Sequence, residues 1–299
     1  MVETASKMTS GVAHISAEKA WSMTGQLPVY GAPEGADALV LADAARSSDM
    51  IVVHVARDGA RAAAMIRALE FFAPDIAVID FPAWDCLPYD RVSPSGAVSS
   101  RRMAALSMIA GHTGKGAFIV VTSVNAVSQK TPPIDVVKSA ALSLAPGATL
   151  DMDELASYLS TNGYARSSTV RERGEFAVRG GLVDIFPPGT DEPVRLDFFG
   201  DSLESVRAFD AETQRTTRQL TRFDLNAASE ILLTDETITR FRTGFVKAFG
   251  AAGDDPLYEA ISAGRMHAGA EHWLPLFYES TDTLFDFCLL YTSPSPRDS

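Results

Sequence analysis

Three groups of residues have types and spacings that could support chemistry. The first, Gly111 to Gly116, resembles a phosphate-binding loop, in which backbone N–H groups cradle phosphates and a Ser or Thr hydroxyl binds the metal. The required pattern is G-x-x-x-x-G-K-S/T, but Ile109 occupies the position of the first glycine and Gly116 that of the hydroxyl residue. The stretch also follows a predicted helix and precedes a predicted strand, the reverse of a phosphate-binding loop. We therefore expect a plain turn.

The second group, His267, Glu271 and His272, resembles the zinc-binding helix of a metallopeptidase. Three residues separate His267 from Glu271, so neither H-E-x-x-H nor H-x-x-E-H is satisfied. Gly264 and Gly269 also argue against one continuous helix. We expect a surface loop here and no metal site.

The third group, Asp80, Asp85 and Asp90, flanks the end of a predicted strand, where α/β enzymes often place their chemistry. No nucleophile–base pair or metal-ligand cluster accompanies these carboxylates in the sequence. We expect them to form turns and caps, and we predict no catalytic residue and no cofactor.

Composition restricts the possible partners. The 299 residues carry a formal net charge of -12, which repels a phosphate backbone and disfavours direct DNA binding. Cys86 and Cys288, the two cysteines, fit a reducing compartment. Neither a signal-peptide h-region within Met1 to Trp21 nor a run of roughly 18 apolar residues is present. We expect a cytoplasmic protein without a membrane segment, and a monomer.

The elements that would position these residues begin with alternating helices and apolar runs. Such runs predict strands buried on both faces of a parallel α/β sheet. The predicted helices are 35–46, 58–72 and 99–110, and the predicted strands are 50–56, 76–79 and 118–122.

The pattern then changes twice. A short helix over 151–160 precedes a period-two stretch that predicts a compact α+β unit. In it, Phe176 to Arg179 and Leu182 to Phe186 flank Gly180-Gly181, which predicts a hairpin with a two-residue turn. Two more strands are predicted over 194–199 and 205–209. Beyond about Phe223 the sequence is helical again, with four residues on one face: Ile238, Phe241, Phe245 and Phe249.

Several colinear stretches resemble the bacterial transcription-repair coupling factors. Residues 81–90, with Ser93-Pro94, are similar to that family's W-E-x-L-P-Y-D-x-x-S-P segment. Residues 173–180 resemble its H-G-E-Y-A-x-R-G element, and residues 195–201 its R-L-D-F-F-x-D element. Residues 268–277 are similar to A-G-x-E-x-W-x-P-L-F. Of the matching residues, we expect Trp84, Pro88 and Tyr89 to pack the first domain.

The resemblance implies the N-terminal, UvrB-like region of the family. It implies a degenerate RecA-like α/β domain, split into residues 1–143 and 227–288, with an inserted α+β UvrA-binding domain at 144–226. It also implies that the first domain is truncated before the domains that bind RNA polymerase and before the ATP- and Mg-dependent motor that translocates on double-stranded DNA. Residues 289–299 have no counterpart in the family; we expect a disordered tail, and a non-native origin stays open.

The resemblance further implies that UvrA binds at Arg179, Arg195 and Phe199. The strand pattern supports part of this, because Arg195, Asp197 and Phe199 share one face if Leu196 and Phe198 point to the core. The structural alternative is an Arg–Asp pair across strands, with Phe199 covering a hydrophobic edge.

The implied function is recruitment of UvrA to stalled RNA polymerase in transcription-coupled nucleotide-excision repair, without catalysis by this chain. One alternative, UvrB-like binding of damaged DNA, needs an aromatic hairpin and a basic channel that the sequence lacks. The other, a Rossmann-like small-molecule enzyme, needs a glycine-rich first turn, whereas Ala56 to Gly59 holds one glycine.

Overall fold

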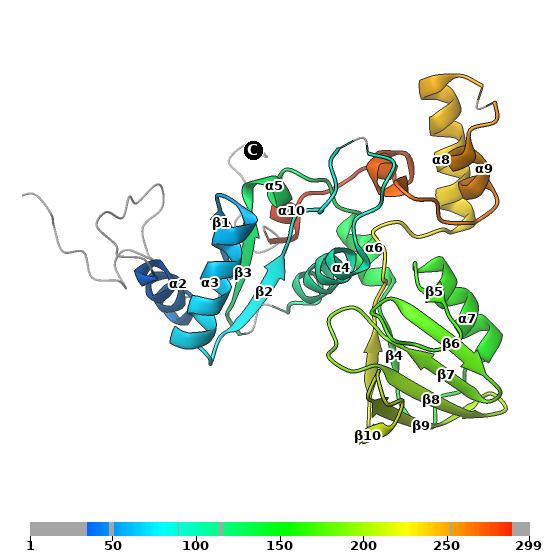
Figure 1. Ribbon diagram of the computed structural model, residues 1–299, viewed down its shortest axis with the longest axis horizontal. Coiled ribbons are helices and arrows are strands. Elements are labelled where there is room, and N and C mark those ends of the chain that lie inside the picture. Colours follow the sequence, from blue (N-terminus) through cyan, green and yellow to red (C-terminus); the bar gives the residue numbers. More distant parts are fainter. Residues whose placement is uncertain (1–34, 48–50, 89, 114–115, 252, 289–299) are drawn as a thin grey trace, which may run out of the picture.

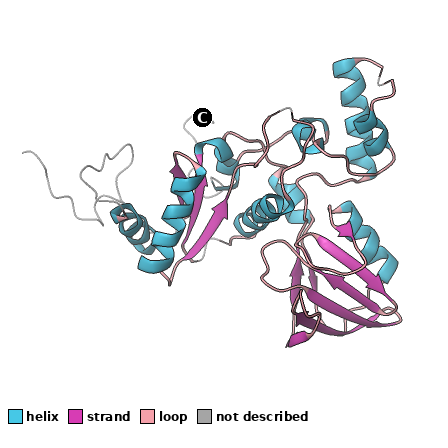
Figure 2. Ribbon diagram, in the orientation of Figure 1, coloured by secondary structure: helices cyan, strands magenta, loops and turns pink. Residues whose placement is uncertain are grey.

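A computed structural model describes residues 35–47, 51–88, 90–113, 116–251 and 253–288, and these form a mixed α/β structure (Figures 1 and 2). Four expectations fall outside the described residues. They concern the N-terminal stretch 1–21, the packing of Tyr89, Gly114-Lys115 of the loop, and the tail 289–299.

The first part of the chain forms a three-stranded parallel sheet in the order β1-β3-β2. Its strands are β1 (Val52–Ala56), β2 (Ala77–Phe81) and β3 (Phe118–Ser123). The expectation that all three are buried on both faces is right for β3, whose six residues are all buried, and wrong for β1 and β2. The reason is topological, because β1 and β2 are the edges of this sheet.

Helices cover both faces of the sheet. One face packs α2 (Ala36–Ser47) and α3 (Gly59–Phe72) against Ile119 and Val121 of β3. The other packs α4 (Gly96–Ala110), α6 (Ile134–Ser139) and α10 (Leu284–Cys288) against Phe118 and Val120. The short helix α5 (Val124–Val127) follows β3. Alternate residues of β3 therefore belong to different cores, as the period of a strand requires. Because α10 packs here, the chain returns to this sheet near residue 288.

The middle of the chain forms a separate six-stranded sheet, seen at the lower right of Figure 1. Its order is β10-β9-β8-β7-β6-β5, antiparallel except for the β5–β6 pair. The strands are β5 (Ala165–Arg166), β6 (Glu175–Arg179), β7 (Leu182–Ile185), β8 (Val194–Phe199), β9 (Ser202–Phe209) and β10 (Thr216–Leu220). Helix α7 (Met152–Thr161) supplies Leu155 and Leu159 to the core on one face of this sheet. We call the opposite face the open face, although a small buried cluster of Val170, Ala177, Phe186 and Phe209 occupies part of it.

The predicted hairpin is confirmed, with Arg179 paired to Leu182 across the two-residue turn. Gly180 adopts φ 58°, a left-handed conformation that L residues with a side chain rarely take. A Cβ on Gly181 would lie 2.7 Å from the carbonyl oxygen of Phe198. The first glycine is thus needed for the turn, and the second for the close approach of β8.

Two short paired strands, together with the contacts between residues 162–164 and 226–229 next to them, connect the two parts of the structure. We call this connection the neck. Strands β4 (Leu142–Leu144) and β11 (Phe223–Leu225) pair antiparallel, so the chain enters and leaves the part with the six-stranded sheet side by side. Just beyond them, the Tyr164 hydroxyl donates to the carbonyl of Asn226 at 2.6 Å. The backbone N–H of Ala228 donates to the carbonyl of Asn162 at 2.8 Å.

A helical hairpin follows the neck, seen at the upper right of Figure 1. It consists of α8 (Asp235–Phe249) and α9 (Pro256–Ser262), followed by the 3-10 helix η1 (Ala270–Leu276). Phe241 stacks on Phe277 at 4.8 Å between ring centroids, and Phe245 is buried beside it. Phe249 is still 55% exposed, so the predicted apolar face of α8 is buried only in part.

Candidate docking surface

The register of the six-stranded sheet brings Arg179 and Arg195 to the open face. Arg179 on β6 lies opposite Leu182 on β7, which lies opposite Asp197 on β8. Two residues further along the strands, and so on the same face, Asp184 lies between Ala177 and Arg195. Two residues that are 16 positions apart in sequence therefore share one surface, with Asp184 between them.

One carboxylate holds both arginines. Arg195 donates to Asp184 through Nε at 2.6 Å and Nη2 at 2.8 Å, a bidentate pair, and Nη2 of Arg179 donates to Oδ2 of the same group. The Asp184 side chain is 1% exposed. The hydrogen bonds from Arg195 to Asp184 raise the pKa of Arg195, so its charge is secure.

The two arginines differ in exposure. The Arg195 side chain is 15% exposed, and its guanidinium lies 4.7 Å from the centroid of the buried Phe209 ring. The Arg179 side chain is 46% exposed. A partner approaching the open face therefore meets the guanidinium of Arg179 more readily than that of Arg195.

Phe199 projects into solvent at the end of β8, where its side chain is 81% exposed. Leu196 and Phe198, its neighbours in the strand, are 0% and 7% exposed and belong to the core under α7. The predicted alternation is confirmed. The structural alternative is right about a cross-strand Arg–Asp pair, which joins Arg195 to Asp184. It is wrong about Phe199, which does not cover a hydrophobic edge.

Sequence reasoning missed two residues of this surface, Asp184 and Arg207. Arg207 on β9 lies opposite Arg195 and donates to Asp197 at 2.8 Å. Its Nε is buried without a hydrogen-bond partner among the described residues. A signal for Asp184 was present in the sequence, because a carboxylate inside the apolar strand Leu182 to Phe186 requires a cationic partner.

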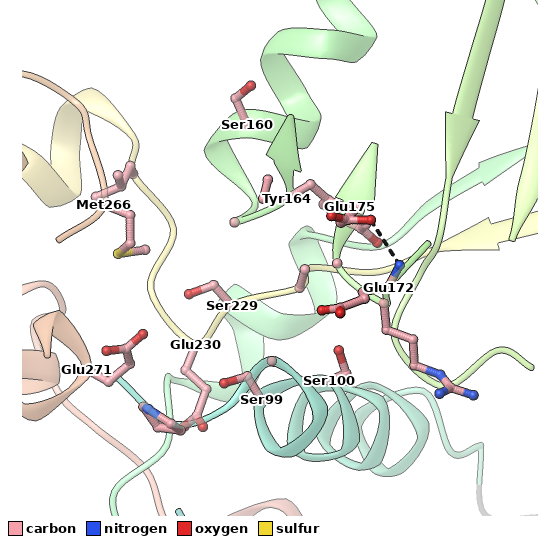
Figure 3. A pocket seen from close by; sticks show the side chains of 18 of the residues that line it. Ser99, Ser100, Ser160, Tyr164, Glu172, Glu175, Ser229, Glu230, Met266 and Glu271 are labelled. Carbon is pink, nitrogen blue, oxygen red and sulfur yellow. Dashed lines mark hydrogen bonds between the residues drawn. The ribbon is translucent and has the colours of Figure 1, made fainter. Parts of the chain in front are cut away.

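A cleft lies between the two parts of the structure (Figure 3). It has a volume of about 480 Å³, and its lining includes Glu172, Glu175, Glu230 and Glu271. Three of these carboxylates already accept hydrogen bonds from other groups of the protein. Glu175 accepts from two backbone N–H groups, Glu230 accepts from Arg102, and Glu271 accepts from Ser93 at 2.7 Å. No group of three or more metal-binding side chains occurs among the described residues.

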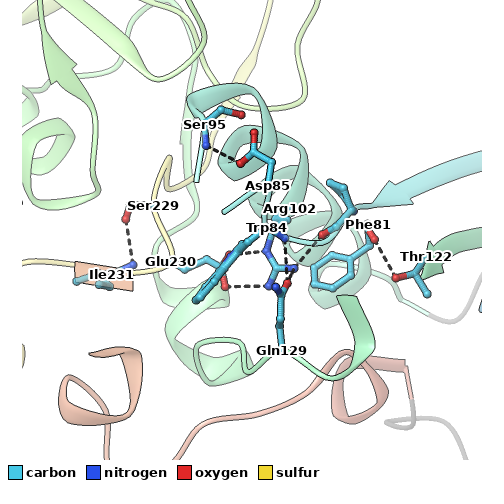
Figure 4. A network of polar contacts seen from close by, with 11 residues as sticks. Phe81, Trp84, Asp85, Ser95, Arg102, Thr122, Gln129, Ser229, Glu230 and Ile231 are labelled. Atoms are coloured by element: carbon cyan, nitrogen blue, oxygen red, sulfur yellow. Dashed lines mark hydrogen bonds and ion pairs between the residues drawn. The ribbon is translucent and has the colours of Figure 1, made fainter. Parts of the chain in front are cut away.

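A buried ion pair joins the segment that follows β11 to helix α4 of the first part of the structure (Figure 4). Arg102 of α4 donates to Glu230 through Nε at 2.6 Å and Nη2 at 3.2 Å, and both side chains are at most 3% exposed. Nη1 of Arg102 donates to Gln129 at 3.0 Å, and Nε1 of Trp84 donates to Glu230 at 3.1 Å. The Phe81 ring lies 4.3 Å from the Arg102 guanidinium. Trp84 therefore packs the interior as expected, whereas Pro88 is exposed and the expectation for it is wrong.

The histidine-containing segment is a loop only in its first half. Glu271 and His272 lie in η1, where His272 packs edge-on against Trp84 at 5.5 Å, and burial raises the pKa of Glu271. The loop expectation is right for His267, which lies in a turn, and wrong for Glu271 and His272, which contact Trp84, Val92 and Ser93 from a distant part of the sequence. A break at Gly269 was expected correctly, since this residue adopts φ 81°.

The remaining candidates have structural roles. Asp85 accepts from the backbone N–H of Ser95 at 2.9 Å, as expected of a turn former. Asp80 instead pairs with Arg101 at 2.8 Å, because α4 runs past the end of β2. Gly111 ends α4 and β3 begins at Phe118, so the glycine-rich stretch connects a helix to a strand. Among the helices of the described ranges, none combines the length and apolar character that crossing a membrane requires.

The segment that carries this surface, and most of the rest of the chain, are similar to known proteins. Residues 142–231 match the family model described as UvrB interaction domain, and this range contains the open face. The chain is 36% identical over 256 residues to a transcription-repair-coupling factor of Haemophilus influenzae, covering 85% of this chain and 22% of that relative. It is 38% identical over 218 residues to that of Rickettsia bellii, covering 73% and 19%.

A third relative, from Myxococcus xanthus, is 38% identical over 262 residues, which cover 82% of this chain and 21% of the relative. The chain thus spans about a fifth of the length of these relatives and is homologous to their N-terminal region. With a UvrB interaction domain and this degree of identity over most of its residues, the chain belongs to the transcription-repair-coupling factor family.

Proposed function

We propose that this chain recruits UvrA to stalled RNA polymerase in transcription-coupled nucleotide-excision repair, and that UvrA docks on the open face at Arg179, Arg195 and Phe199. The observation that carries the proposal is the exposure of Phe199. An aromatic side chain that is 81% exposed, on the same face of the sheet as two arginines, has the composition of an interface hot spot. The match of residues 142–231 to a UvrB interaction domain supports the same partner.

The proposal includes a division of the chain. Residues 1–143 and 227–288 would form one degenerate RecA-like domain, and residues 144–226 the inserted docking domain. This agrees with the return of α10 to the first sheet and with the paired strands of the neck. We propose no catalysis by this chain. ATP-driven translocation on double-stranded DNA, and the contact with RNA polymerase, would belong to other domains of the family.

The composition of the described site favours a protein partner over DNA. The net charge of -12 opposes a phosphate backbone, and two carboxylates, Asp184 and Asp197, offset most of the charge of Arg179, Arg195 and Arg207 on the open face. A protein surface with an apolar recess for Phe199 and an acidic group for Arg179 fits better.

The test is binding of purified UvrA to this chain and to the double variant Arg195→Ala, Phe199→Ala, with folding of each checked by thermal unfolding. We expect saturable binding by the unchanged chain and its loss in the variant. A matched control is Phe249→Ala, which removes an exposed aromatic side chain (55% exposed) from the helical hairpin and should bind normally. A well-folded chain that does not bind UvrA contradicts the proposal.

A further inference from the structure

We infer that Asp184 is a positioning residue of the docking surface, because it fixes the guanidinium of Arg179 for an acidic group of the partner and uses Arg195 as an internal support. The inference rests on the proposed docking function. It gives Arg179 and Arg195 different roles, although the family resemblance assigns both to the same site. It also adds Asp184, which the partner would not contact.

The distribution of hydrogen bonds separates the two arginines. Arg195 directs Nε and Nη2 to Asp184, and its Nη1 lies 3.5 Å from the carbonyl oxygen of Gln214. Because the Arg195 side chain stacks on Phe209 and is only 15% exposed, it has few N–H donors available to a partner. A guanidinium has five N–H donors. Arg179 gives one Nη2 contact to Asp184 and keeps its side chain 46% exposed, so its other donors are available to a partner.

The charges indicate what Arg179 meets. Two guanidinium groups share one carboxylate, so this cluster carries an excess positive charge. The neighbouring Arg207–Asp197 pair is balanced one to one. A carboxylate on the partner would complete the cluster with a charge-assisted hydrogen bond, while Phe199 enters an apolar recess nearby.

Preorganisation explains why a buried anion is useful at such a place. A free arginine side chain loses rotamer freedom when a partner immobilises it, which weakens binding. Asp184 imposes that restriction on Arg179 before the partner arrives. Removing the carboxylate should therefore weaken docking even though no atom of Asp184 lies on the surface.

The experiment compares UvrA binding by Asp184→Asn, Arg179→Ala and the double variant of this chain. We expect Asp184→Asn to bind about tenfold more weakly. The double variant should lose clearly less than the sum of the two single losses, because Asp184 acts in large part through Arg179. The control is Glu192→Gln, which removes the carboxylate of another ion pair of this sheet, with Arg218 at 3.1 Å, and should leave binding unchanged. Equal binding by Asp184→Asn and the unchanged chain, or additive losses in the double variant, overturns the inference.

A second measurement needs no variant and covers the case in which Asp184→Asn does not fold. The arginine Nε–Hε resonances of the unchanged chain are followed by NMR while UvrA is added. We expect the Arg179 resonance to move or broaden far more than that of Arg195. Equal perturbation of both would contradict the division of tasks. If the unchanged chain does not bind UvrA, the docking function itself fails, a result distinct from binding that ignores Asp184.

Discussion

Phe198 and Phe199 are consecutive in β8 and face opposite sides of the sheet, one 7% and the other 81% exposed. Phe198 belongs to the core under α7, whereas Phe199 lies on the proposed docking surface. Because the two side chains are chemically identical, this dipeptide allows stability and the proposed binding to be tested separately.

Phe198→Ala should lower the free energy of unfolding by about 3–5 kcal/mol, because it leaves a cavity in the core. Phe199→Ala should change it by no more than about 0.5 kcal/mol but weaken UvrA binding by about 2 kcal/mol or more. Urea unfolding and a binding titration of both variants check this. A large loss of stability in Phe199→Ala would show that this ring packs in solution.

Glu230→Gln should destabilise the protein by about 3–5 kcal/mol, because it leaves the guanidinium of Arg102 buried without its anion. The matched control is Asp80→Asn on the exposed Arg101–Asp80 pair, next to Arg102 on the same helix. It should cost no more than about 1 kcal/mol. Chemical unfolding of the two variants measures the difference, and equal small losses would contradict a buried pair.

Gly163→Ala should destabilise the neck. Gly163 adopts φ 84°, and an added Cβ would lie 2.2 Å from Cβ of Ser229. The control Gly147→Ala has a similar φ of 89° but no atom within 4 Å, so it should show only the left-handed strain of about 1–2 kcal/mol. The melting temperature of Gly163→Ala should fall clearly below that of Gly147→Ala. Similar values would indicate that Ser229 moves aside at little cost.

His54 should make stability depend on pH. Burial lowers the pKa of His54, so the unfolded chain takes up the proton first as the solution is acidified. This contribution to stability is present above the unfolded pKa of about 6.5 and is lost as the pH falls through the folded pKa. In His54→Gln, the loss of stability on acidification from neutral pH should be smaller, as measured by urea unfolding at several pH values.

ATP should not stabilise this chain. At the start of α3, where a phosphate-binding loop would present backbone N–H groups, Oδ1 of Asp58 already accepts from the N–H of Arg61 at 2.9 Å. A phosphate there would meet a carboxylate. We expect no shift in melting temperature with Mg-ATP and no hydrolysis. Turnover that persists through purification and disappears with a point mutation in this chain would contradict the prediction.

The sequence by itself determined the local features of the proposed docking surface. Alternation along residues 194–199 places Leu196 and Phe198 inside and Phe199 outside, because successive side chains of a strand point to opposite faces. Gly180-Gly181 specified the hairpin turn, because only a residue without a Cβ adopts its backbone conformation at little cost. These conclusions depend on residues within a few positions of one another.

Only the tertiary structure decided which distant residues meet. Asp184 holds Arg195 because β7 and β8 are neighbours in that register, and a shift of one residue would point them to different faces. Arg102 and Glu230 are 128 positions apart, and no local pattern pairs them. The exposure of β1 and β2 likewise follows from strand order, since an apolar run is buried on both faces only where neighbours cover it. Local sterics are written in short stretches of sequence, whereas long-range partners are set by the packing of the whole chain.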